Sequence, residues 1–179
     1  MNNNTNTMNN NGRTIVIVNR NNTALIFNAT NAKTTTVKAD NTSMASITAV
    51  TSLLEKLDEK ATELTTIIVP RSLSIMLQMN RPQSIKDNGY KSEDESRSYT
   101  KEYIDSLIYI NQLRQYLGTK VVQFRISGSS ILTKEQSQAI RNAWALMDSL
   151  EQPQPVSNKI QRPKRPTNVS MKSVELNIL

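Results

Sequence analysis

The chain of 179 residues contains neither cysteine nor histidine. Without cysteine it can form no disulfide, no thiolate metal site and no cysteine nucleophile. Without histidine it has no imidazole general base and no imidazole-ligated metal. Any metal would have to be a hard cation with oxygen ligands, and catalysis would depend on carboxylates, lysine, tyrosine or serine.

Glycine and long apolar runs are also scarce. The four glycines, at positions 12, 89, 118 and 128, form no glycine-rich phosphate loop. No segment approaches the roughly 18 apolar residues of a membrane span. The start is rich in asparagine and threonine and does not resemble a signal peptide. We therefore expect no cofactor, no membrane contact and a cytoplasmic protein, in the host cytoplasm if a phage encodes it.

Positive charge is concentrated near the end of the sequence. The whole chain has 22 basic and 15 acidic residues, a net charge of +7, and residues 153–179 have five basic residues and one acidic residue, a net charge of +4. This pattern indicates either an arm that contacts phosphate or an acidic protein surface, or a solvated linker. We expect a disordered Asn-rich N-terminus at 1–12, an α/β domain at 13–152 and a basic, Pro-containing tail at 153–179.

The first half of the domain has strong strand patterns. Residues 14–18 form a β-branched, apolar run that is typical of a strand buried on both faces. Asn-rich turns separate it from strands at 23–27 and at 33–38, and the last of these is Thr-rich and should be more exposed. Three strands joined by short turns predict an antiparallel meander.

The second half alternates between helix and strand patterns. Apolar residues at spacings of three and four predict a helix at 44–61 that Asn41 or Ser43 caps. A strand reached through a helix is normally parallel to its neighbour in the sheet. The other expected segments are a strand at 65–69, a short helix at 72–79, a polar loop at 80–98, a helix at 99–117, a strand at 120–126, and a helix from Thr133 with Gln136 as its capping-box partner and Trp144 and Leu150 on its inner face.

This order of elements resembles the ribonuclease H-like superfamily over residues 13–150. The resemblance implies an α/β fold with a five-stranded mixed sheet, in which three antiparallel strands precede two parallel ones and helices cover both faces. A ferredoxin-like or other mixed α/β sandwich can give a similar order. The fold class is therefore an expectation from topology, without a diagnostic sequence motif.

The resemblance also implies a nuclease site in which four carboxylates hold two divalent cations beside a phosphate. The corresponding positions here carry Asn19, Ser46 and Pro70, and Arg71 follows where it would repel a cation. Only Glu135 stands near a position where the family has a carboxylate. We therefore expect no metal ligand, no catalytic residue and no enzyme activity.

Basic residues on strands and in the tail are the candidate contacts for nucleic acid. Several of those on strands can share one face. The predicted set is Arg13, Arg20, Lys33, Lys38, Arg71, Arg81, Lys120, Arg125, Lys159, Arg162, Lys164 and Arg165. A second pattern is the alternation of apolar Val174, Leu176 and Ile178 with polar residues, which predicts a strand that docks on the sheet edge of a partner or of a second copy, or else a frayed end.

Three functions remain open at the level of sequence. The leading hypothesis is a non-catalytic protein of a phage or mobile element that binds nucleic acid or a nucleoprotein complex. The alternatives are a protein-interaction or assembly module that docks through its tail, and a divergent metal-dependent nuclease. The low aromatic content argues against stacking of successive bases, although Tyr90, Tyr99 and Tyr103 flank the polar loop, either as contacts or as ordinary surface residues.

Overall fold

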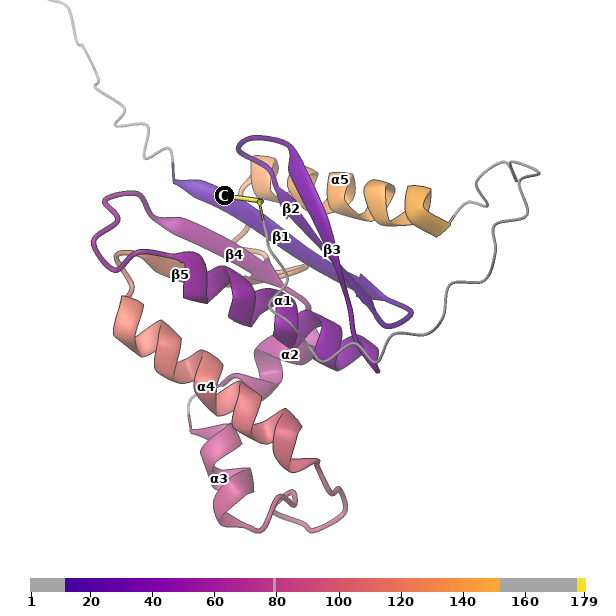
Figure 1. Ribbon diagram of the computed structural model, residues 1–179, viewed down its shortest axis with the longest axis vertical. Coiled ribbons are helices and arrows are strands. Elements are labelled where there is room, and N and C mark those ends of the chain that lie inside the picture. Colours follow the sequence, from indigo (N-terminus) through magenta and orange to yellow (C-terminus); the bar gives the residue numbers. More distant parts are fainter. Residues whose placement is uncertain (1–11, 79, 152–176) are drawn as a thin grey trace, which may run out of the picture.

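The β-branched runs assemble into one open sheet that carries helices on both faces (Figure 1). The computed structural model describes residues 12–78, 80–151 and 177–179. The strands are β1 (Arg13–Arg20), β2 (Thr23–Asn28), β3 (Lys33–Lys38), β4 (Thr65–Val69) and β5 (Val122–Ile126). The helices are α1 (Thr42–Lys56), α2 (Arg71–Met76), α3 (Arg81–Asp87), α4 (Lys101–Leu117) and α5 (Lys134–Glu151).

The strand order is β3-β2-β1-β4-β5. β1 pairs antiparallel with β2, and β2 pairs antiparallel with β3. β4 is parallel to both β1 and β5. The expected α/β class and five-stranded mixed sheet are confirmed, and the topology is consistent with the ribonuclease H-like order. β1 is central, as its apolar run predicts, and the Thr-rich β3 is an edge strand.

Alternate side chains of β1 contribute to two separate cores. Ile15 and Ile17 pack in the larger core, together with buried residues of α1 and α4. Val16 and Val18 pack in the smaller core, against Ala143 and other residues of α5. A strand with apolar side chains on both faces therefore holds the helical layers together.

The first helix differs from its expected bounds of 44–61. It begins after Asn41, whose side-chain oxygen accepts a hydrogen bond from the backbone N–H of Met44 at 2.9 Å. It ends before Leu57, which has extended backbone angles. The side chain of Asp58 accepts from the backbone N–H of Lys60 at 2.9 Å, and such local bonds compete with a continuing helix.

The segment expected to be a loop at 80–98 contains a helix, which corrects the sequence prediction. Two buried residues, Pro82 and Ile85, give α3 a narrow apolar side, and α3 packs against α4. The proline lies near the helix start, where its missing N–H has no helical partner to lose. In Figure 1, α3 and the adjoining end of α4 extend away from the sheet.

The last helix begins as its sequence predicts, but its buried face ends earlier than the sequence predicts. Thr133 Oγ1 accepts from the N–H of Gln136 at 3.1 Å, and Gln136 Oε1 accepts from the N–H of Thr133 at 3.0 Å, which confirms the capping box. Met147 is buried, whereas Leu150 is 57% exposed, so its expected place on the inner face is wrong. The helix extends past the sheet that would cover it. No helix in the described part of the chain is both long and apolar enough to cross a bilayer.

Candidate functional site

Three parallel strands bring their carboxyl ends to one end of the sheet. We call the end that contains Arg20 and Val69 the carboxyl edge, and the end that contains Arg13 and Thr65 the amino edge. β5 is parallel to β4 and ends at the carboxyl edge, and α2 starts there, directly after Pro70. In open α/β sheets, the crevice beyond the carboxyl ends of parallel strands is the usual place for a ligand.

Two of the positions where the resemblance implies metal ligands meet at the carboxyl edge. The side-chain Nδ2 of Asn19, on β1, donates to the Oγ of Ser46, on α1, at 2.6 Å. Ser46 is 1% exposed. An amide and a hydroxyl are neutral, so this pair offers no carboxylate to a divalent cation. Within residues 12–78, 80–151 and 177–179, no group of three or more acidic, histidine or cysteine residues is placed to hold a metal.

Glu135, the one acidic residue expected near a ligand position, lies elsewhere. It lines a hollow together with Thr14, near the amino edge, whereas Asn19 lies at the carboxyl edge. The reason is the direction of α5, which starts near the amino edge and runs back across the sheet. Its later residue Asp148 reaches Arg20 at 2.7 Å.

A cavity of about 310 Å³ opens beside Asn19 and Ser46. Four segments form its wall: β1, α1, α2, and the stretch from α3 to the first turn of α4. The polar and aromatic lining residues besides Asn19 and Ser46 are Ser43, Ser72, Arg81, Arg97, Tyr99 and Tyr103. The lining therefore contains two cations, several hydroxyl groups and no carboxylate.

Both arginines of this cavity are exposed and available to a ligand. Across the described residues, the guanidinium groups of Arg81 and Arg97 have no hydrogen-bond or ion-pair partner. A guanidinium group presents several N–H donors in a plane, which suits the oxygens of a phosphate or carboxylate. The cavity therefore has the charge and the donors of an anion site.

The loop before α4 fixes the backbone of Arg97. The N–H of Arg97 donates to Ser92 Oγ at 3.0 Å, and its carbonyl accepts from the N–H of Ser92 at 2.9 Å. Asp94 Oδ1 accepts from the hydroxyls of Ser92 and Ser96 at 2.6 and 2.7 Å. These hydrogen bonds lower the pKa of Asp94 to about 2. Asp94 therefore organises the loop that carries Arg97.

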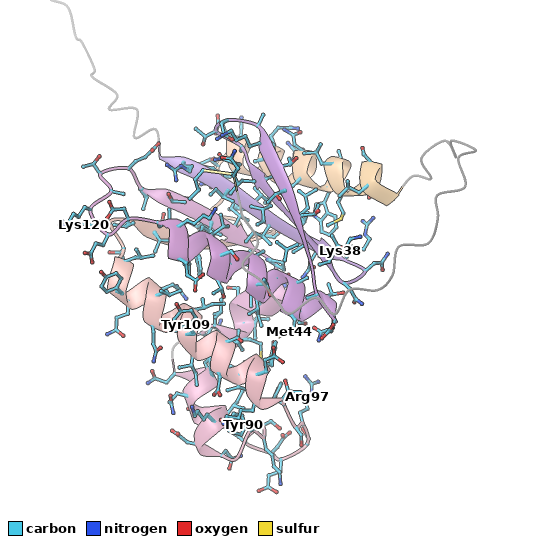
Figure 2. The ribbon with its side chains drawn as sticks, viewed as in Figure 1. Lys38, Met44, Tyr90, Arg97, Tyr109 and Lys120 are labelled. Atoms are coloured by element: carbon cyan, nitrogen blue, oxygen red, sulfur yellow. The ribbon has the colours of Figure 1, made fainter. Side chains whose placement is uncertain are left out.

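The same arginines also line a second, wider hollow of about 610 Å³. It shares Arg81, Arg97 and Tyr99 with the first cavity, and Glu93 and Asp94 also line it. The mixed charge of this lining makes it less favourable for an anion than the first cavity. Figure 2 shows Arg97 near the end of α4 that lies away from the sheet, with Met44, at the start of α1, above it.

The structure divides the predicted basic residues between the two ends of the sheet. Arg20, Lys38, Arg71, Arg81 and Arg125 lie at or beyond the carboxyl edge. Arg13, Lys33 and Lys120 lie at the amino edge. Figure 2 shows Lys38 and Lys120 on opposite sides of the molecule. The eight residues thus do not form one surface, and of the first five Arg81 lines the anion site.

Two of the eight form ion pairs within the fold. Arg13 lies 3.5 Å from Glu63, and Arg20 lies 2.7 Å from Asp148. The guanidinium of Arg20 also lies over the ring of Trp144, 5.1 Å from its centroid. Trp144 is half-buried against the smaller core, in agreement with its predicted core position. These contacts make Arg13 and Arg20 weaker candidates for phosphate than Arg81 or Arg97.

Most of the predicted tail contacts lie outside the described residues: Lys159, Arg162, Lys164, Arg165, Val174 and Leu176. Ile178 is described and has no exposed surface. It packs in the larger core, and its carbonyl accepts from Nδ2 of the buried Asn28 at 3.2 Å. This residue, predicted to dock on a partner, is therefore buried within its own chain here.

Sequence patterns did not identify Arg97, Ser43 or Ser72 as site residues. The missing information was tertiary, because α3 must fold onto α4 before Arg81 and Arg97 can face the same cavity. Tyr99 and Tyr103 were named as possible contacts, and both line the cavity. A scan against protein-family models and a search of curated proteins found no match to this chain.

Proposed function

We propose that the protein binds nucleic acid at the carboxyl edge without cleaving it, as a ribonuclease H-like domain that lacks the metal-binding carboxylates. The observation that carries this proposal is the cavity lined by Arg81 and Arg97, which contains no carboxylate. Phosphate is the anion that nucleic acids present to every protein that binds them, and it dominates their affinity.

Further cations extend the basic surface beyond the cavity. Arg71 begins α2, Lys38 ends β3 and Arg125 is the penultimate residue of β5, so all three adjoin the same edge. None of the three lines the cavity, so a bound nucleic acid would contact them through phosphates outside it. Several phosphate contacts of this kind give an affinity that falls steeply as salt is added.

The absence of cleavage is proposed from the residues at the expected ligand positions. Two-metal cleavage needs carboxylates that hold both ions beside the phosphate. Asn19 and Ser46 satisfy each other by a hydrogen bond, and Pro70 follows β4. These positions therefore offer no carboxylate that could hold a metal. The cavity beside Asn19 and Ser46 is lined by arginines instead.

The proposal is tested by titrating labelled single-stranded DNA, duplex DNA and RNA with the full chain at several salt concentrations. Arg81→Gln and Arg97→Gln should each weaken binding and reduce the salt slope by about one. Lys33→Gln and Lys120→Gln remove the same charge at the amino edge and serve as matched controls. They should change binding much less.

Two results would overturn this function. Undetectable binding at low salt excludes it and leaves the protein-interaction hypothesis. Cleavage of any of these substrates that requires Mg²⁺ or Mn²⁺ contradicts the non-catalytic part. The tail is tested in the full chain by replacing Lys159, Arg162, Lys164 and Arg165 with glutamine, because truncation would also remove the buried Ile178.

A further inference from the structure

Two tyrosines stand beside the arginines in the wall of the cavity. The rings of Tyr99 and Tyr103 stack with their centroids 6.1 Å apart and an angle of 13° between their planes. Both are half-buried, and both line the cavity. An aromatic face next to paired cations is the combination that proteins use for an unpaired base and its phosphate.

Hydrogen bonds hold the backbone that carries these two rings. The N–H of Tyr99 donates to the carbonyl of Tyr90 at 2.8 Å. Thr100 caps α4, and its hydroxyl accepts from the N–H of Tyr103 at 3.2 Å. Burial raises the pKa of Tyr103, so its hydroxyl is neutral at physiological pH. The backbone that carries both rings is therefore held by hydrogen bonds, and the hydroxyl of Tyr103 is uncharged.

The size of the cavity limits what can enter it. About 310 Å³ is at the small end of ligand pockets, which span roughly 300–1,000 Å³, and it suits a single nucleotide. A base that is paired in a duplex cannot enter such a cavity without leaving the stack. The faces of the sheet are covered by α1, α4 and α5, so they offer no platform for successive bases.

We propose that the cavity takes one unpaired nucleotide of a single-stranded nucleic acid. Arg81 and Arg97 hold its phosphate, and its base lies against the wall formed by Tyr99 and Tyr103. The hydroxyl groups of Ser43 and Ser72 line the same cavity and are available to the sugar or the base edge. This assignment rests on the proposed function, since it specifies which form of nucleic acid the site accepts.

The test compares one oligonucleotide in three forms: single-stranded, as a blunt duplex, and as a duplex with one unpaired nucleotide. The full chain should bind the single strand and the duplex with the unpaired nucleotide at least about 10-fold more tightly than the blunt duplex. 2-Aminopurine at the unpaired position should lose fluorescence on binding, because the base stacks on an aromatic ring.

Variants of Tyr99 test the aromatic wall. Tyr99→Leu should weaken single-strand binding by about 5- to 150-fold, the range given by base–aromatic stacking, whereas Tyr99→Phe should keep it. Tyr116→Leu is the matched control, because Tyr116 is 66% exposed and lies near the far end of α4. Thermal unfolding of each variant shows whether the fold is kept. If Tyr99→Leu does not fold, the binding of Tyr99→Phe and the quenching of 2-aminopurine still test the aromatic wall.

The two levels of the hypothesis fail differently. The single-nucleotide assignment is wrong if blunt duplex binds as tightly as single strand, or if 2-aminopurine is not quenched. The proposed function still stands in that case, provided that Arg97→Gln weakens binding. If no nucleic acid binds at low salt, both are wrong. If Tyr99→Leu folds and binds single strand as the wild type does, the tyrosines do not form the base site.

Discussion

The side-chain amide of Asn19 donates a hydrogen bond to the hydroxyl of Ser46 at 2.6 Å, and this bond joins the carboxyl end of β1 to α1. Both residues also line the cavity that we assign to a nucleotide. The pair therefore has two roles. It connects the sheet to the helix that covers it, and it gives the floor of the cavity a neutral, polar surface beside two arginines.

We expect Ser46→Ala to lower the free energy of unfolding by about 1 kcal/mol, because Asn19 loses an acceptor at a partly buried position. Asn19→Ala should cost a similar amount. Urea unfolding of both single variants and the double variant measures the coupling between the two side chains. If the two losses simply add, the hydrogen bond contributes nothing to stability.

The sheet could be predicted because each of its strands has a local signal. The β-branched run around Val16 is buried on both faces, and the Asn-rich turn at 21–22 adopts positive φ at both residues, as asparagine tolerates. The change from continuous apolar runs to apolar residues at spacings of three and four marks α1. Elements with a strong local pattern therefore appear in the structure close to where the sequence predicts them.

The site could be predicted only in part, because its residues come together through weakly patterned segments. α3 has only two buried residues, Pro82 and Ile85, so the sequence indicates a loop. Without α3 the positions of Arg81 and Arg97 relative to one another are undefined. The burial of Ile178 likewise depends on a contact with Asn28, 150 residues earlier in the chain, for which the sequence has no local signal.

Asp94 should titrate at unusually low pH, because the hydroxyls of Ser92 and Ser96 donate to its carboxylate. Its pKa of about 2 lies below the ordinary value of 3.8. The stabilisation of the loop is therefore fully present above about pH 4 and is lost as the pH falls through 2. Carboxyl NMR titration should give a midpoint near 2 in the folded chain.

The control for this titration is the double variant Ser92→Ala/Ser96→Ala, in which the midpoint should move toward 3.8. A midpoint near 3.8 in the wild-type chain would contradict the hydrogen-bonded loop. Because Asp94 stays ionised at every pH above about 4, the position of Arg97 should not change between pH 5 and pH 8.

The ion pair between Arg20 and Asp148 should contribute little to stability. The side chains are 37% and 61% exposed, so water and salt screen their attraction. We expect Asp148→Asn to lower the free energy of unfolding by less than about 1 kcal/mol, and by still less in high salt. Denaturant unfolding followed by the fluorescence of Trp144 measures this. A loss of several kcal/mol would show that the pair has a larger structural role.

Ile178 should be far more important for stability than its place next to the last residue suggests. Its side chain has no exposed surface, and Asn28, itself 1% exposed, donates to its carbonyl. Ile178→Ala removes three carbon atoms from the larger core, a change that typically costs about 2–5 kcal/mol. Ile131→Ala makes the same chemical change at a side chain that is 66% exposed, and should cost less than about 0.5 kcal/mol. Equal midpoints of urea unfolding for the two variants would show that the C-terminal residues do not pack in the core in solution.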